Sequence, residues 1–145
     1  MNQSILILLG SLLIFPSSET GAASREAVYG EGAMVSSRST LASTVGVKIM
    51  KQGGNAIDAA VATAFALAVT YPSAGNIGGG GFAVIHFEDG KVITQDHREM
   101  APGAAHRDMY LDDNGDEIKG LSRSSLLVTG APGSVEGLLG LLGEY

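Results

Sequence analysis

The sequence contains no cysteine among its 145 residues. Disulfide bonds, thiolate metal sites and a cysteine nucleophile are therefore excluded. Basic residues are also scarce, with nine lysines and arginines against fifteen aspartates and glutamates, and the net charge is −6. This balance argues against nucleic acid as a partner, because phosphates need a basic surface. The length indicates one domain or part of one.

Long apolar runs are rare as well, and the most apolar one stands at the start of the chain. Ile5–Phe15 is followed by small and polar residues, and it is shorter than the roughly 18 residues that span a bilayer as a helix. The pattern predicts a signal peptide over residues 1–24, although the segment before it carries no lysine or arginine. An uncleaved anchor or a buried helix are the alternatives. We therefore expect an exported protein, periplasmic or secreted, with residues 25–145 as the mature part.

Two helices are predicted after a short strand at Ala33–Ser36. Ser39 or Thr40 can cap the first helix. Its apolar positions recur at helical spacing and predict a covering helix with one apolar face, namely Leu41, Val45 and Ile49.

The second helix is predicted to be buried on most sides. Gly53 fits the left-handed position that closes the first helix. Asn55 then caps the second, with Asp58 placed for a capping box. No charge follows over residues 59–69, which indicates burial. Pro72 ends the helix.

Residues 75–102 carry the pattern around which the rest of the chain is organised. Four glycines at 78–81 precede two extended runs separated by Asp89 and Gly90. Asp-Gly between two such runs predicts a hairpin with a type I′ turn. In that register Glu88 pairs with Lys91.

Following the same register down the hairpin brings Arg98 opposite Gly81, where nothing but backbone faces the guanidinium. Its planar donors suit a carboxylate or a phosphate, so we expect an anion site there. The alternative is an ion pair of Arg98 with Asp96 or Glu99 that stabilises the sheet edge. The glycine run fits neither a P-loop nor a dinucleotide fingerprint, which leaves close packing and ligand contact both open.

The last third of the chain is predicted to contain a turn, a strand and a helix. Asp112–Asp116 lacks the glycine position of a calcium loop and is interpreted as a solvated turn. The histidines have no metal-site spacing, so no metal is expected. Leu126–Val128 is a candidate strand, and Pro132 or Ser134 opens a helix. Glycines repeat along one side of that helix and predict a close backbone neighbour: Gly133, Gly137, Gly140 and Gly143.

Four segments in this order resemble the large subunit of the γ-glutamyltranspeptidase family. They are Asn55–Ala60, Gly75–Phe82, Asp96–Pro102 and Pro132–Gly137. The resemblance covers roughly residues 32–145. It implies an α/β fold, part of the αββα sandwich of the N-terminal-nucleophile hydrolases, left incomplete because the small subunit is not included.

The resemblance also implies an activity and a role for three residues. Family members transfer or hydrolyse the γ-glutamyl group of glutathione-like substrates, with water or an amino acid or dipeptide as acceptor. Their nucleophile is the threonine that autoproteolysis exposes at the start of the small subunit. No residue here matches that region, so no catalytic residue is expected in this chain, which alone should be inactive. The match assigns Arg98 to the substrate α-carboxylate, with Glu99 and Asp96 in support, and implies no cofactor.

Two other functions fit the same residues. One is a related acylase or a poly-γ-glutamate depolymerase on the same scaffold. The other is a non-catalytic module in which Arg98 binds a carboxylate.

Overall fold

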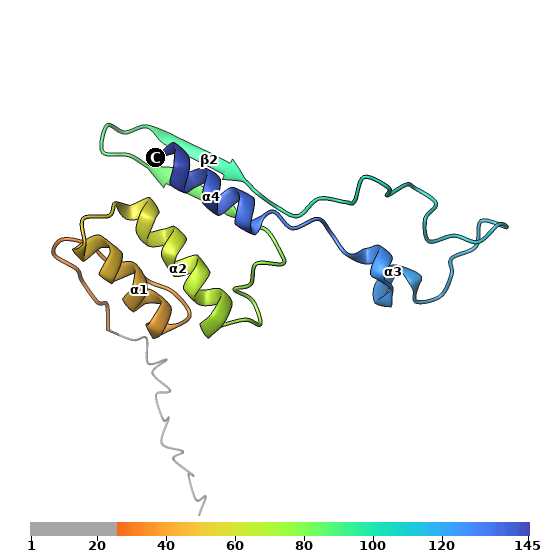
Figure 1. Cartoon of the computed structure of the whole chain (residues 1–145), viewed down its shortest axis with the longest axis horizontal. Coiled ribbons are helices and arrows are strands. Elements are labelled where there is room, and N and C mark those ends of the chain that lie inside the picture. Colours follow the sequence, from red (N-terminus) through yellow and green to blue (C-terminus); the bar gives the residue numbers. More distant parts are fainter. Residues whose placement is uncertain (1–25) are drawn as a thin grey trace, which may run out of the picture.

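The computed structural model describes residues 26–145, so the predicted signal peptide at 1–24 lies outside the described residues. Helix α1 lies beside α2, and a β-hairpin with α4 lies on the other side of α2 (Figure 1). The elements in chain order are α1 (Thr40–Lys51), α2 (Ala56–Thr70), β1 (Phe82–His86), β2 (Val92–Asp96), α3 (Leu121–Ser124), the 3₁₀ turn η1 (Leu126–Val128) and α4 (Ser134–Glu144).

The junction between α1 and α2 forms as the sequence predicts. Gly53 has a φ of 99°, in the left-handed region. The Asn55 side-chain oxygen accepts hydrogen bonds from the backbone N–H groups of Ile57 and Asp58, at 2.7 and 2.9 Å. The Asp58 carboxylate in turn accepts from the Asn55 N–H at 2.8 Å. This capping box is confirmed, and it satisfies N–H groups that the helix itself leaves unpaired.

Replacing Asn55 with alanine should loosen the first turn of α2, because two N–H groups lose their acceptor. A lost cap costs about 1 kcal/mol, so the amides of this turn should exchange with solvent roughly five times faster. Hydrogen-exchange mass spectrometry measures this. Ser39→Ala is the comparator at the start of α1, where the capping bond is longer, at 3.4 Å. An unchanged exchange rate in N55A would contradict the capping role.

Helix α1 packs through a different face from the one predicted. Leu41 is 70% exposed, whereas Ala42 is fully buried. Gly46 lies so close to α2 that a Cβ placed there would meet the Thr63 hydroxyl and lie 3.0 Å from the Ala59 carbonyl oxygen. Small side chains let the two helix backbones approach, and this outweighs the apolar stripe in deciding which face is buried.

The core lies between the hairpin and the helices. The two strands alternate exposed and half-buried residues, so the inner face of the hairpin packs on α2 and α4 while its outer face carries exposed Phe82, Val84 and Val92. Buried Ile57, Val61 and Leu141 form the centre of the core. The residues packed around them are Phe65, Ala83, Ile85, Phe87 and Leu138.

The hairpin turn differs from the prediction by one residue. Phe87 donates its N–H to the Lys91 carbonyl oxygen at 2.8 Å, and Gly90 donates to the Phe87 carbonyl oxygen at 3.0 Å. The loop is thus Glu88–Gly90, with positive φ at Gly90 alone (85°). This is the three-residue hairpin loop in which a type I turn is followed by a left-handed glycine. The predicted Glu88–Lys91 pair is therefore wrong.

The longer loop shifts the whole register. Phe82 pairs with Asp96 and Ile85 with Ile93. Beyond the strands, Gly81 and His97 exchange hydrogen bonds at 3.3 and 3.0 Å. Arg98 therefore stands opposite Gly80 rather than Gly81. The neighbour is still a glycine. The prediction that no side chain faces Arg98 is therefore confirmed, although the residue opposite is Gly80.

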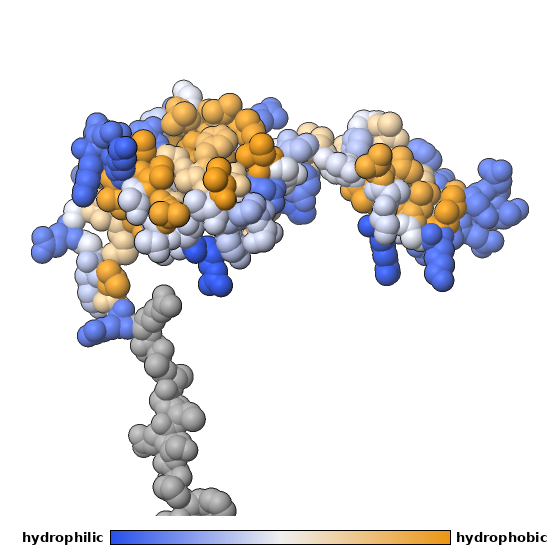
Figure 2. All heavy atoms as spheres, turned by 60° about the horizontal axis from the view of Figure 1, so that its bottom comes forward, coloured by the Kyte–Doolittle hydropathy of each residue, from blue (hydrophilic) through white to orange (hydrophobic). Residues whose placement is uncertain are grey.

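Two predicted strands are absent from the structure. Ala33–Ser36 is irregular, and Leu126–Val128 forms η1. The second belongs to an arm, residues 101–130, that carries α3 and extends away from α1, α2 and α4 (Figure 1). The arm begins and ends where Met100 and Ala131 exchange backbone hydrogen bonds at 3.0 and 2.8 Å. Apolar side chains gather on the part formed by α1, α2, α4 and the hairpin, and again on the arm (Figure 2).

Candidate functional site

Arg98 lies on the outer face of the hairpin, two residues beyond the end of β2. Its guanidinium carbon is 5.9 Å from the centre of the Phe82 ring, which is cation–π distance. Within residues 26–145 the guanidinium forms no ion pair with a carboxylate. The glycine opposite is required here, since a Cβ on Gly80 would lie 2.5 Å from the Arg98 Cα.

Of the two carboxylates predicted to support Arg98, Asp96 binds its backbone and Glu99 lies elsewhere. Asp96 shares the exposed face with Arg98, as predicted, and its carboxylate accepts the Arg98 backbone N–H at 3.0 Å. The side chain of Glu99 lies beside Gly130, where an added Cβ would be 3.2 Å from the Glu99 Cγ. The structure thus brings Asp96 and Arg98 together and directs Glu99 to the returning end of the arm.

A hollow of about 440 Å³ lies between the end of β2 and the start of α4. Arg98 supplies the one positive charge among its lining residues, while Asp96 and Glu136 supply carboxylates. A zwitterionic ligand, such as the amino-acid end of a larger substrate, has charges of both signs to match. The remaining lining residues are Gln95, His97, Met100, Ala131, Pro132, Gly133, Gly137 and Gly140.

The sequence did not single out His97, which lies at the centre of this region. A Cβ on Gly137 would meet the His97 Cβ and Cγ, and one on Gly81 would lie 2.9 Å from its Nε2. The Nδ1 atom is buried without a hydrogen-bond partner. The glycine repeat of α4 was the signal that could have revealed this contact, because it predicted a close neighbour without identifying it.

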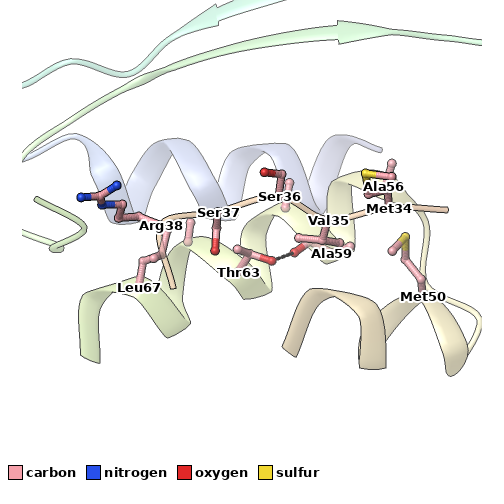
Figure 3. Close-up of a pocket in the computed structure, with 12 residues that line it drawn as sticks. Met34, Val35, Ser36, Ser37, Arg38, Met50, Ala56, Ala59, Thr63 and Leu67 are labelled. Carbon is pink, nitrogen blue, oxygen red and sulfur yellow. Dashed lines mark hydrogen bonds between the residues drawn. The ribbon is translucent and has the colours of Figure 1, made fainter. Parts of the chain in front are cut away.

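A second hollow, of about 450 Å³, lies between residues 34–38 and α2 (Figure 3). It shares no lining residue with the hollow at Arg98. Two of its hydroxyl groups are engaged, since that of Thr63 donates to the Ala59 carbonyl oxygen at 2.7 Å and that of Ser37 to the Ser39 carbonyl oxygen at 2.8 Å. Arg38 is the charged residue of the lining.

Asp112 forms the solvated turn that the sequence predicts. Its carboxylate accepts the backbone N–H groups of Asp116 and Asn114, both at 2.9 Å. These bonds hold the pKa of the Asp112 carboxyl below its ordinary value of 3.8. Their stabilising effect is therefore present above that value and is lost as the pH falls through the lowered pKa. The groups engaged here are backbone amides, as in a local turn.

Residues 26–145 contain neither a candidate metal site nor a candidate membrane-spanning helix. No group of three or more histidine, aspartate or glutamate side chains is placed to hold a metal ion. No helix in the described part is both long and apolar enough to cross a membrane.

Solved structures with the same arrangement place the chain in a structural class. Gamma-glutamyltranspeptidase of Helicobacter pylori is 47% identical and superposes with a TM-score of 0.76, over 83% of this chain and 34% of that one. The helices and hairpin are part of an N-terminal-nucleophile hydrolase fold. Within residues 26–145 the helices cover one face of the hairpin, and the other face is exposed.

Sequence comparison identifies the family. The pattern described as gamma-glutamyltranspeptidase matches residues 42–145, and the chain belongs to this family of enzymes. A glutathione hydrolase proenzyme of Pseudomonas sp. (strain A14) is 54% identical over 81% of the chain. That of Escherichia coli (strain K12) is 52% identical over 77%. The chain spans about a fifth of the length of these relatives, 20% and 19%.

Proposed function

We propose that the chain is the N-terminal portion of the large subunit of a proenzyme that transfers or hydrolyses the γ-glutamyl group of glutathione-like compounds. Arg98 carries the proposal. Its guanidinium is free of carboxylate partners within residues 26–145, and Arg98 is one of the residues that line a hollow of about 440 Å³. A free α-carboxylate is the group that such a planar fork of donors binds best.

The neighbouring residues have separate tasks in this proposal. Asp96 fixes the backbone of Arg98 through the bond at 3.0 Å, so that the guanidinium leaves the strand at a set position. Glu99 forms part of the wall where the arm returns. Anchoring the amino-acid end of the substrate places the γ-carbonyl within reach of a nucleophile, and such positioning removes several kcal/mol from a barrier.

The nucleophile and the second subunit complete the proposal. The hydroxyl of an N-terminal threonine of the small subunit adds to the γ-carbonyl while its own amino group takes the proton. The amide C–N bond then breaks, the amine leaves with that proton, and the γ-glutamyl group remains as an ester of the threonine. The small subunit packs on the bare outer face of the hairpin, where Phe82 and Val84 are 68% and 73% exposed. Water or an amino acid or dipeptide then takes the γ-glutamyl group.

The apolar run Ile5–Phe15 directs export to the periplasm or medium.

The test compares the processed proenzyme that carries this chain with residues 26–145 alone, using γ-glutamyl-p-nitroanilide. The proenzyme should release p-nitroaniline and glutathione should compete, whereas the chain alone should give no release above a blank. An inactive but correctly processed proenzyme would contradict the proposed reaction. Release by the chain alone would contradict the assignment of the nucleophile to the small subunit.

The matches to glutathione hydrolase proenzymes favour this function over the alternatives considered from the sequence. The related acylase, the poly-γ-glutamate depolymerase and the non-catalytic carboxylate-binding module have no observation of their own in the structure.

A further inference from the structure

We propose that His97 is the positioning residue that sets the direction of Arg98, and that it acts through the shape of its ring. The inference rests on the proposed function of Arg98 as the ligand of the substrate α-carboxylate. His97 precedes Arg98 directly, and alternation along the strand turns its side chain to the opposite face of the hairpin.

The backbone of His97 is the last paired position before Arg98. Its N–H donates to the Gly81 carbonyl oxygen at 3.0 Å, and its carbonyl oxygen accepts the Gly81 N–H at 3.3 Å. The direction in which the Arg98 side chain leaves the hairpin therefore depends on the position of His97. The Asp96 carboxylate holds the Arg98 N–H from the other side.

The side chain of His97 fills a space left by glycines of two other elements. A Cβ on Gly137 of α4 would meet its Cβ and Cγ, and a Cβ on Gly81 would lie 2.9 Å from its Nε2. The backbone of His97 is enclosed as well, since a Cβ on Gly133 would meet its carbonyl oxygen. On these sides the ring is confined by backbone rather than by adaptable side chains.

Hydrogen bonds hold α4 against this part of the hairpin. The Gln95 side-chain amide donates to the Gly137 carbonyl oxygen at 3.0 Å. The Gly79 carbonyl oxygen accepts the N–H groups of Gly133 and Ser134 at 2.9 and 3.0 Å. These bonds keep Gly133 and Gly137 in place beside His97.

The ring contributes by filling space rather than through a hydrogen bond at Nδ1. Nδ1 is buried and has no hydrogen-bond partner. An apolar ring of similar size removes this unpaired atom and keeps the packing, which is a tolerated exchange. An alanine removes the packing. The two substitutions therefore separate the shape of the side chain from its chemistry.

The experiment measures kcat and KM of the processed proenzyme with γ-glutamyl-p-nitroanilide, per mole of processed enzyme. His97→Ala should raise KM about tenfold and lower kcat by a smaller factor, since the anchor for the α-carboxylate is displaced while the nucleophile is untouched. His97→Phe should stay within about twofold of the original KM. When Arg98 is already alanine, adding H97A should raise KM no further.

Gly137→Ala and Gly143→Ala form a matched pair on the same helix. The first places a methyl group against His97, whereas nothing lies within 4 Å of a Cβ on Gly143. G137A should reproduce the KM increase of H97A, and G143A should not. This pair tests the proposal even if H97A lowers the yield of processed enzyme.

Two results would overturn the inference while leaving the proposed function intact. One is an active proenzyme in which H97A leaves KM unchanged although R98A raises it. The other is an H97F variant as impaired as H97A. An inactive wild-type proenzyme would instead overturn the proposed function, and this inference with it.

Discussion

Replacing Arg98 with alanine should lower kcat/KM for γ-glutamyl-p-nitroanilide by roughly 100- to 1000-fold. A bidentate guanidinium–carboxylate pair contains two charge-assisted hydrogen bonds, each of about 1.5–3 kcal/mol. Part of this is regained when water solvates the free carboxylate, and about 3–4 kcal/mol of lost transition-state binding corresponds to the stated range. Arg98→Lys should be intermediate, because lysine keeps the charge and loses the fork.

A substrate without the α-carboxylate isolates the contact. The 4-aminobutyryl anilide differs from the γ-glutamyl anilide by this group alone, so the original enzyme and R98A should process it at similar, low rates. Arg107→Ala is the matched control variant, because Arg107 is 96% exposed and its distance to the Asp108 carboxylate is 3.9 Å. Equal losses on both substrates in R98A would contradict carboxylate recognition and indicate a folding defect.

The local signals in the sequence predicted local structure well. Asn55, Asp58 and Gly53 determine where two helices meet, and each acts within a few residues of itself. The hairpin was also predictable, yet its register was not. Asp89-Gly90 fits a two-residue loop, but a three-residue loop needs positive φ only at Gly90 and avoids it at Asp89. One residue in the loop then changes every cross-strand partner.

Non-local packing could not be predicted in the same way. A strand depends on a partner, and Leu126–Val128 finds none in the described part of the chain, so it forms a 3₁₀ turn that begins at a Ser125 side-chain cap. The buried face of α1 was assigned from its large apolar residues, whereas Ala42 and Gly46 decide it. Arg98 was correctly predicted to share a face with Asp96 and to stand opposite a glycine, although that glycine is Gly80 rather than Gly81. The packing of the His97 side chain could not be predicted, because it depends on where α4 packs.

Alanine at Gly80 should destabilise the end of the hairpin, whereas alanine at Gly79 should not. A Cβ on Gly80 would lie 2.5 Å from both the Arg98 Cα and the Glu99 nitrogen, and these backbone atoms cannot rotate away. Overpacking of this kind costs about 1–3 kcal/mol. A Cβ on Gly79 would meet only the Asn76 side-chain oxygen, at 3.9 Å.

The comparison is well matched because the two glycines are neighbours and neither has a positive φ. Both substitutions reduce the freedom of the unfolded chain, which alone favours folding by about 0.4–1 kcal/mol. G80A should therefore increase amide exchange around residues 80–84 and 94–98 and raise KM for the γ-glutamyl substrate, while G79A leaves both unchanged. Equal behaviour of the two variants would mean that the strands can separate at Gly80. The position of Arg98 would then depend on contacts other than the close approach of the Gly80 backbone.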